Sequence, residues 1–243
     1  SSIILSETVE VLEVIKNLTI TSSATVVGDM LAADTETVVS FDAAVLAGNR
    51  IEYGFNFDVD NIASTAIPTN VQSELAMSHT VTQMFTDPGN YTIQVNATNL
   101  VSSHPTVSLE SDLIIQRRVI ESEVDFSNAL LLALPATEVI FNLVLTPGSL
   151  EPTNVFYEIE FGDGSNSSGF IPSFPHLIPY NYDGSVIGTV VPKIVLSNLV
   201  SSVVKTSTLM IQQAIGGLEF RLIPTHAASR VSVSVIPEVT QGS

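Results

Sequence analysis

The stretch Ile51-Glu52-Tyr53-Gly54-Phe55-Asn56-Phe57-Asp58 alternates large apolar residues with polar or small ones. Successive side chains of a β-strand point to opposite faces, so this pattern places the odd positions on a core face and the even positions in water. The same alternation occurs in residues 39–45 and in residues 91–97, the latter after the turn signal Asp87-Pro88-Gly89-Asn90. The sequence therefore predicts antiparallel strands with one solvated face.

The composition of the 243 residues also favours an all-β protein, because β-branched and hydroxyl residues are abundant and Trp is absent. Charged residues make up only 14% of the chain, yet 25 acidic against 8 basic residues give a net charge of −17. Binding to nucleic acid or to an anionic membrane surface is not expected, since such affinity comes largely from Lys and Arg. The chain has no cysteine, which excludes disulfides and sulfur-ligated metals.

No membrane insertion is expected within this chain, because its longest apolar run, residues 129–134, is far shorter than the roughly 20 residues that span a bilayer. Residues 1–5 contain neither an initiator Met nor a basic region before an apolar one, so they are not an intact signal peptide. A cleaved signal or an upstream region is compatible with this start.

An internal repeat organises the chain. Asn99-Leu100-Val101-Ser102-Ser103 recurs 99 residues later as Asn198-Leu199-Val200-Ser201-Ser202, and residues 51–57 match residues 155–161 at a separation of 104 residues. The two separations imply a loop that is five residues shorter in the second copy. A repeat of about 100 residues has the size of an immunoglobulin-like sandwich. The predicted fold is therefore two such β-sandwiches in tandem.

The second copy carries a family motif. Tyr157-Glu158-Ile159-Glu160-Phe161-Gly162-Asp163-Gly164, followed by a His, a Tyr and an Asn, resembles the PKD (polycystic kidney disease) repeat, whose hallmark is a strand ending in Trp-Asp-Phe-Gly-Asp-Gly. Ile159 and Glu160 replace the Trp and the first Asp. The first copy lacks Gly-Asp-Gly but fits the later positions. The later positions of the two copies are His79, Phe85, Gly89, Tyr91 and Asn99, and His176, Tyr182, Gly188 and Asn198.

The resemblance implies PKD-like β-sandwiches used in extracellular regions as spacers, adhesive modules or force-bearing links. The motif itself has a structural interpretation. Phe161 ends the core face of its strand, Gly162 and Gly164 allow unusual backbone angles, and Asp163 can accept hydrogen bonds from neighbouring amides. His79 and His176 are interpreted as hydrogen-bonded structural residues.

The predicted domains are residues 17–117 and residues 118–213. Residues 1–16 are interpreted as the last strand of a preceding repeat, and residues 214–243, with alternating Val231, Val233 and Val235, as part of a following repeat or an exchanged strand. Two explanations are open: the chain is a piece of a longer protein, or it is a filament subunit whose terminal strands complete a neighbour, since an unpaired edge is a template for strand addition.

Two kinds of modification or ligand site follow from short motifs. Four Asn-x-Ser/Thr sequons predict N-linked glycans if the protein is secreted by a eukaryote. They begin at Asn17, Asn90, Asn96 and Asn166. Asp58, Asp60, Asn61 and Asp163 are the candidate ligands of a weak calcium site, because hard cations take oxygen ligands in loops. The alternative is that these short acidic turns simply face solvent.

No enzymatic motif is present. The four His are scattered, and no Gly-x-Ser-x-Gly, phosphate-binding glycine loop or His-Glu-x-x-His motif occurs. We therefore expect no catalytic residue and no cofactor beyond the calcium candidate. The predicted function is a non-enzymatic extracellular structural or adhesive protein, a segment of a stalk or a subunit of a fibre, whose partners are neighbouring repeats or identical subunits. The alternative is a cell-surface module that binds glycan or protein through the loops at 60–78 and 164–181.

Overall fold

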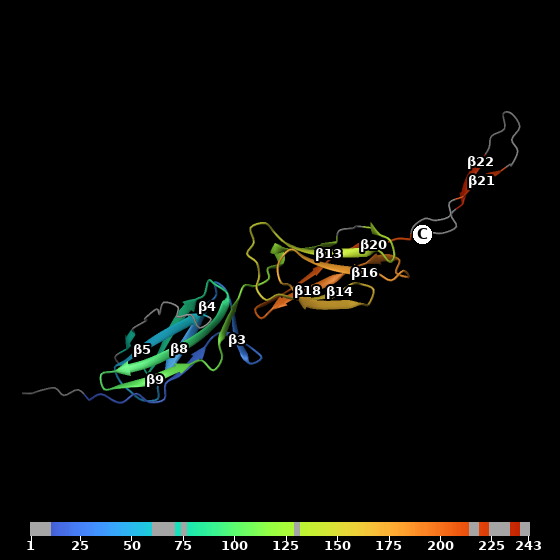
Figure 1. Cartoon of the computed structure of the whole chain (residues 1–243). Helices are drawn as coiled ribbons and strands as arrows, with labels where there is room; N and C mark the ends of the chain where they lie inside the picture. The colour runs from blue at the N-terminus through green and yellow to red at the C-terminus, as the bar shows by residue number, and fades with distance from the viewer. Residues whose placement is uncertain are drawn as a thin grey trace, which may run out of the picture. The chain divides into compact units, whose positions relative to one another are not determined.

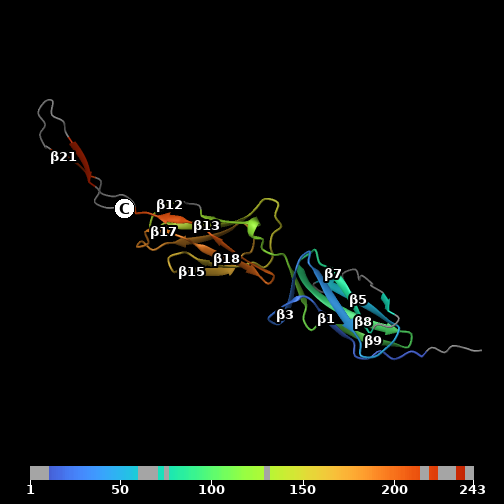
Figure 2. The same ribbon diagram turned by 180° about the vertical axis from the view of Figure 1, so that it is seen from behind.

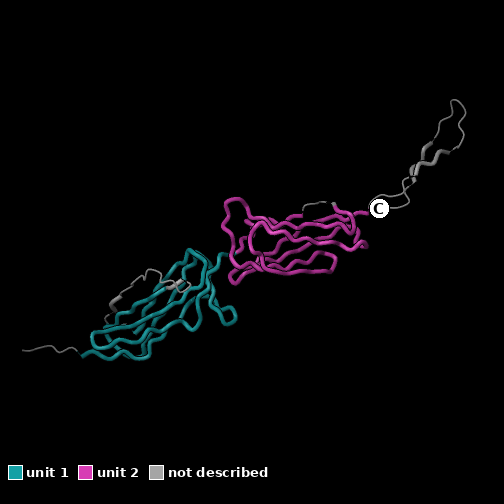
Figure 3. Tube along the Cα trace, in the orientation of Figure 1, with its two compact units in different colours: residues 1–118 teal, residues 119–243 magenta. Residues whose placement is uncertain are grey.

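The computed structural model describes residues 11–59, 71–73, 77–128, 132–213, 219–223 and 234–238. The chain divides into two compact units, Ser1–Arg118 and Val119–Ser243 (Figure 3). In the described residues every regular element is a strand except one short 3₁₀ helix, η1 (Glu121–Glu123). None of the helical structure described is long or apolar enough to cross a membrane. The all-β prediction is confirmed.

Unit 1 is a sandwich of a three-stranded and a seven-stranded sheet. The smaller sheet has the order β1-β4-β7, and the larger has the order β2-β3-β10-β8-β5-β6 with β9 also paired to β8. Figure 1 shows β5, β8 and β9 side by side, and Figure 2 shows β1 and β7 from behind. The bounds are β1 (Thr19–Ser22), β2 (Thr25–Val27), β3 (Met30–Asp34), β4 (Val38–Ala44), β5 (Ile51–Val59), β6 (Val71–Ser73), β7 (Ser78–Met84), β8 (Gly89–Asn99), β9 (Ser102–Ser108) and β10 (Leu113–Gln116).

The core of unit 1 lies between these sheets and follows the alternation in the sequence. Every odd position of β5 from Ile51 to Phe57 is buried, as are Phe41 on β4 and the inward positions of β8. Ile15, which precedes the first strand, is also buried in this core. The domain limits expected from the sequence stay predictions, but the leading segment from residue 11 packs onto the sandwich that follows it, because Ile15 needs that apolar environment.

Unit 2 repeats most of the topology of unit 1, with β17 and β18 in the place of β8. One sheet has the order β11-β13-β16, and the facing strands form two sheets with the orders β12-β20-β17 and β15-β14-β18-β19. The bounds are β11 (Val124–Asn128), β12 (Leu132–Ala133), β13 (Glu138–Leu145), β14 (Phe156–Glu160), β15 (Asn166–Phe170), β16 (His176–Asn181), β17 (Gly188–Val190), β18 (Lys193–Asn198), β19 (Ser201–Thr206) and β20 (Leu209–Ile211). A separate buried cluster, which includes Phe141, Phe161 and Ile194, fills the unit.

In both units a strand near the start pairs in parallel with the last strand of the sandwich. In unit 1, β3 and β10 are in register from Leu31 opposite Leu113 to Asp34 opposite Gln116. In unit 2, β12 and β20 align Leu132 with Met210 and Ala133 with Ile211. In each sandwich this parallel pair therefore connects an early part of the chain with its last strand.

The segment after unit 2's last sandwich strand contains a hairpin. β21 (Glu219–Ile223) pairs antiparallel with β22 (Ser234–Glu238), so Val235 lies opposite Leu222. Val231 and Val233, expected in a terminal strand, lie outside the described residues. The two described strands of this segment pair with each other.

Candidate functional site

The Gly-Asp-Gly turn of unit 2 follows directly after β14. Buried Phe161 donates its amide to the Ser165 carbonyl (3.0 Å), and Gly162 and Gly164 have φ of +87° and +95°. Asp163 Oδ1 accepts the Ser165 amide at 3.0 Å and also its hydroxyl. The turn thus reverses the chain between β14 and β15 with its own carboxylate bridging the backbone, as Asx turns do.

Two tyrosines, Tyr180 on β16 of the other sheet and Tyr182 just after β16, hold this turn onto the sandwich. The Tyr180 hydroxyl donates to Asp163 Oδ2 (2.8 Å), and its ring stacks on Phe161 with centroids 3.7 Å apart. The Tyr182 hydroxyl, fully buried, donates to the Phe161 carbonyl (2.9 Å). Turn, strand end and core ring therefore form one hydrogen-bonded cluster.

The pKa values in this cluster shift for identifiable reasons. Partial desolvation acts to raise the pKa of Asp163, but hydrogen bonds from the hydroxyl and amide of Ser165 and from Tyr180 outweigh it and lower that pKa. Burial, with the charge of Asp163, raises the pKa of Tyr182. Tyr180 also has a raised pKa, mainly from desolvation. At neutral pH the carboxylate is ionised and both phenols are neutral donors, which is the state the hydrogen bonds require.

Gly162 has a second role, because the backbone of Val191 passes close to it. A Cβ on Gly162 would lie 2.9 Å from the Val191 amide nitrogen. Val191-Pro192 is also the point at which the strand opposite is interrupted between β17 and β18. Glycine at position 162 is therefore needed for close approach as well as for its positive φ.

The repeated pentapeptide forms the turn between the last two long strands of each unit. In unit 1 the Asn99 carboxamide oxygen accepts the Ser102 amide (2.8 Å) and hydroxyl (2.9 Å), which closes the turn from β8 to β9. Asn99 Nδ2 donates to the carbonyls of Glu13 (2.7 Å) and Asn49 (3.1 Å). One side chain therefore joins three segments: the turn, the leading segment and the β4–β5 loop.

Ser102 completes this junction by accepting the Ile15 amide at 3.0 Å. Unit 2 repeats it. Asn198 donates to the Thr153 carbonyl (2.9 Å) and accepts the Ser201 hydroxyl (2.8 Å), while Ser201 Oγ accepts the Val119 amide (2.8 Å). The pentapeptide is thus an anchor that fixes where the chain arrives at each sandwich.

The candidate calcium ligands are not brought together. Asp58 is in β5, Asp60 and Asn61 lie outside the described residues, and Asp163 belongs to the turn of unit 2. In the described parts of the chain no group of three or more His, Asp or Glu is placed to hold a metal ion. Calcium binding stays a prediction.

The two family histidines pack against aromatic rings. His79 stacks on Tyr53 with centroids 6.0 Å apart, and His176 lies 5.6 Å from Tyr157. Tyr53 and Tyr157 occupy matching positions of the two copies. Both imidazoles thus make ring contacts across the sandwich, and hydrogen bonding of these histidines stays a prediction. These contacts join strands of two different sheets, β5 with β7 and β14 with β16.

All four sequon asparagines are exposed: Asn17, Asn90, Asn96 and Asn166. Asn96 lies on the outer face of β8 over Gly54, where a Cβ would come within 2.3 Å of the carboxamide oxygen. Asn166 begins β15, the edge strand of its sheet. Exposure permits glycosylation at each site, and glycosylation stays a prediction.

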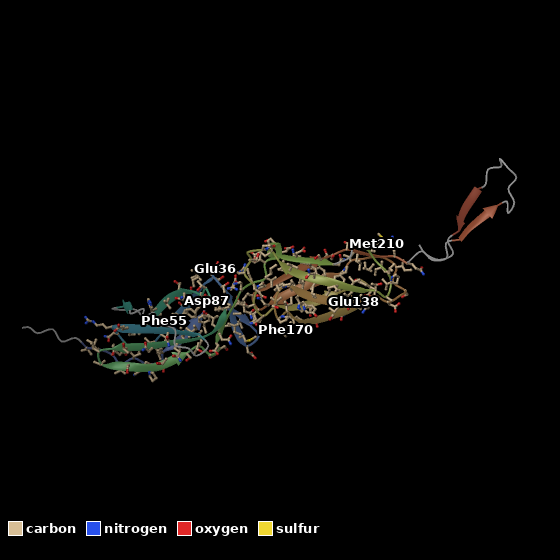
Figure 4. All side chains as sticks on the ribbon, turned by 45° about the horizontal axis from the view of Figure 1, so that its top comes forward. Glu36, Phe55, Asp87, Glu138, Phe170 and Met210 are labelled. Carbon is tan, nitrogen blue, oxygen red and sulfur yellow. The ribbon has the colours of Figure 1, made fainter. Side chains whose placement is uncertain are left out.

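A shallow hollow of about 300 Å³ lies on the outer face of β14, β15 and β18 in unit 2. Its lining side chains include Glu158, Glu160, Asn166, Ser168 and Lys193. Exposed Phe170 ends β15, in edge-on contact with Phe156 at 5.1 Å, and Figure 4 shows it on the surface of the unit. These groups offer hydrogen bonds and an aromatic surface to a ligand.

Sequence reasoning missed two features of these sites. Tyr180 was not singled out, although its position two residues before Tyr182 on one strand face was a signal. The anchoring role of Ser102 and Ser201 was also missed, although their repetition within an otherwise divergent pair of copies marked them.

The comparisons with known proteins agree with this fold. The model of the PKD domain family matches residues 18–108, in unit 1, although Gly-Asp-Gly is in unit 2. A comparison with curated protein sequences finds no match.

Solved structures add likeness of fold. A D1–D4 ectodomain fragment of ICAM-5 has a TM-score of 0.55 and 10% identity, over 89% of this chain and 60% of that one. A two-domain fibronectin type III segment from chicken tenascin gives a TM-score of 0.44 and 11% identity, over 81% and 98%. The chain thus spans about three fifths of the ICAM-5 fragment. Within a chain of tandem immunoglobulin-like sandwiches, residues 18–108 are therefore similar to a PKD domain.

Proposed function

We propose that the chain is a non-enzymatic, load-bearing segment of an extracellular structural protein, acting as part of a stalk or fibre. The observation that carries this is the parallel pairing of a strand near the start with the last strand of the sandwich in both units. When the chain ends are pulled apart, such a pair is loaded in shear, so its hydrogen bonds must break together. Antiparallel neighbours in a hairpin instead open one bond at a time.

In unit 1 the parallel pair is extended by further bonds at one end. The Thr35 amide donates to the Gln116 carbonyl (3.0 Å), and Asp34 accepts the Arg118 amide (3.2 Å) and pairs with its guanidinium. Arg118 follows β10 and Asp34 ends β3, so this ion pair closes the same clamp. A charge-assisted pair with hydrogen bonds resists separation more than a neutral bond does.

Over the residues that the structure describes, the clamp of unit 2 is shorter. There β12 and β20 share two register positions, extended by the hydrogen bond from the Gln212 amide to the Ala133 carbonyl (3.0 Å). We expect unit 2 to be the mechanically weaker sandwich.

The extracellular location is supported by the PKD domain and by the exposure of all four sequons. A chain without cysteine depends on core burial and strand pairing for its strength. Glycans on exposed asparagines would add solubility to a surface with few charges.

Single-molecule stretching of the chain between terminal handles tests the proposal. We expect two separate unfolding events, unit 2 before unit 1, and a lower force for unit 1 in Asp34→Ala. The control pulls the β18–β19 hairpin apart from its open end. Because the chain has no native cysteine, handles can be attached at Lys193→Cys and Thr206→Cys, which are register partners of the two strands, and pulling there unzips the hairpin. Terminal pulling that needs no more force than this unzipping contradicts a load-bearing function.

A second candidate is a binding module, favoured by the hollow on unit 2 and exposed Phe170. The loops expected to bind are only partly loops: within 164–181, β15 and β16 leave residues 171–175 between them, and most of 60–78 lies outside the described residues. A glycan array probed with the chain and with a Phe170→Ala variant tests whether the chain is a binding module. Binding that the variant abolishes supports a module, and an array without signal removes it.

A further inference from the structure

One pole of unit 1 exposes apolar side chains from three segments of the chain. Leu46 in the β4–β5 loop is 68% exposed, and Leu100 and Val101 at the β8–β9 turn are 85% and 55% exposed. Val11 of the leading segment is exposed as well. Asn99 and Asn49 hold these three segments together by hydrogen bonds. The exposed apolar side chains of the segments therefore form one patch, here called the leading pole.

The fold itself does not need these apolar side chains. The β8–β9 turn is made by Asn99 and Ser102, and Leu100 and Val101 project from its tip. An exposed apolar patch is a liability to a soluble protein unless it has a partner. Leu100 and Val101 are therefore available for a contact outside the unit.

The same apolar tip is present in the second copy. Leu199-Val200 repeats Leu100-Val101, and the β13–β14 loop carries Leu150, 63% exposed, as the β4–β5 loop carries Leu46. Several core positions differ between the copies: Tyr91 corresponds to Val190, and Ile93 to Pro192. Leu100 and Val101 are exposed in unit 1, whereas Leu199 and Val200 are half-buried in unit 2, so both copies keep this apolar pair but only unit 1 leaves it exposed.

The place where the chain enters unit 2 indicates which part of a protein is joined to a sandwich at this pole. Val119, the first residue of unit 2, is bound to Ser201 of its pentapeptide, and the residue before it ends another sandwich. The leading pole is therefore the end of a sandwich at which a preceding sandwich is joined. In unit 1 the equivalent surface is apolar and exposed.

The opposite end of unit 2, here called the trailing pole, has matching chemistry. Leu134 and Ile187 are each 50% exposed. Leu134 follows a register partner of Ile211, and Ile187 precedes another, so the two side chains lie on either side of Ile211. Figure 4 shows Met210 and Phe170 toward opposite ends of unit 2. Because Met210 precedes Ile211, Leu134 and Ile187 lie at the end away from Phe170.

The charges of the two poles are also complementary. Exposed carboxylates of the trailing pole are Glu138 and Asp183. The leading pole of unit 1 carries exposed Lys16 and Arg50, two of only eight basic residues in the chain, beside Glu13. Complementary charge around an apolar centre is the usual anatomy of a specific interface.

We propose that the leading pole of unit 1 docks onto the trailing pole of unit 2 of a second copy of this chain. The contact is heterologous, because different surfaces meet, so it extends copy after copy into a filament unless its rotation closes a ring. This rests on the fibre form of the proposed function. It places the assembly contact at sandwich ends and requires no exchange of strands.

Sedimentation velocity over a wide concentration range tests the contact. The unaltered chain is expected to show reversible growth beyond a dimer, reduced by high salt because charges border the interface. The variants Leu46→Ser/Leu100→Ser and Leu134→Ser/Ile187→Ser each weaken association about tenfold or more, as loss of central interface residues does. Val26→Ser, equally exposed but on β2, is the matched control and leaves association unchanged.

Mixing the two pole variants provides the decisive readout. Each retains the pole that the other lacks, so the mixture forms one-to-one dimers and stops there. A chain that stays monomeric at all concentrations, or pole variants that associate as the unaltered chain does, overturns the proposal. Thermal unfolding and circular dichroism verify that the variants are folded. The stretching experiment uses single molecules, so a high unfolding force without self-association would remove this contact and leave the load-bearing function standing.

Discussion

The two sandwiches share a topology but close the same end in different ways. Unit 2 uses Tyr182, whose hydroxyl donates to the Phe161 carbonyl, with Tyr180 bonded to Asp163. The matching positions of unit 1 are Phe85 and Gln83. Phe85 instead packs in an aromatic cluster with Phe41 and Phe57, at 6.3 and 6.1 Å.

Unit 1 has a tyrosine of its own at this end, on a different strand. Tyr91 of β8 lies 4.5 Å from Phe85 and donates its hydroxyl to the Asp87 carbonyl (2.9 Å). Unit 2 has Val190 at that position. The loss of Gly-Asp-Gly in unit 1 thus accompanies the loss of both tyrosines that bind it. The difference teaches that one topology tolerates either a polar cluster or an aromatic one at the same place.

The largest expected effect tests whether the two cores are independent. Phe41→Ala removes a fully buried ring from unit 1, and Phe141→Ala does the same in unit 2. Each should lower the stability of its own unit by about 3–5 kcal/mol, because a cavity replaces the ring. Differential scanning calorimetry should show one transition shifted and the other unmoved. Exposed Phe170→Ala is the control, and a joint shift of both transitions would contradict independence.

The next effect separates close approach from backbone strain in the unit 2 turn. Gly164→Ala should cost about 1–2 kcal/mol, the cost of positive φ for a residue with a Cβ, since nothing lies within 4 Å of that Cβ. Gly162→Ala should cost more, about 3 kcal/mol, because the new methyl also meets the Val191 backbone. Urea unfolding of both variants measures the difference. Equal costs would mean that Val191 moves aside freely.

A smaller effect is expected from the anchor that the units share. Asn99→Ala and Asn198→Ala each leave backbone groups of a turn and a loop without their partner, which should cost about 1–2 kcal/mol in the unit concerned. Hydrogen exchange should show the Ile15 amide losing protection in the first variant and the Val119 amide in the second. If both amides keep their protection, the serines anchor the chain without the asparagines.

The smallest effect is the acid sensitivity of unit 2. Asp163 has a lowered pKa in the folded protein, so it contributes stability above the unfolded carboxyl value of about 3.9, and this is lost as pH falls through the folded value. The carboxylate is largely solvent-exposed, so the contribution should stay below about 1 kcal/mol. Asp163→Asn should flatten the pH dependence of the unit 2 melting temperature below pH 4, with unit 1 as the internal control.

Much of the fold could be predicted from local pattern. The alternation at residues 51–58 places each apolar side chain on the buried face, because a strand has a period of two residues whatever it pairs with. The repeat spacing predicted a second sandwich in the same way. The sites were less predictable. The Asp163 bond to Tyr180 joins residues 17 apart in sequence, and the junction of Asn99 with Glu13 joins residues 86 apart. Neither contact can be predicted from a periodic pattern in the local sequence.

The sequence by itself determined the class of the protein: all β, duplicated, sparsely charged and acidic, with a PKD-like motif in its second copy. These properties depend on composition and on contacts between near neighbours, which a linear pattern records. Only the tertiary structure decided that His79 and His176 pack on tyrosines, that Ile15 belongs to the sandwich that follows it, and that Leu46 and Leu100 share one pole. Those relations depend on which strand ends meet when two sheets close over a common core, and that choice is made by the whole chain at once.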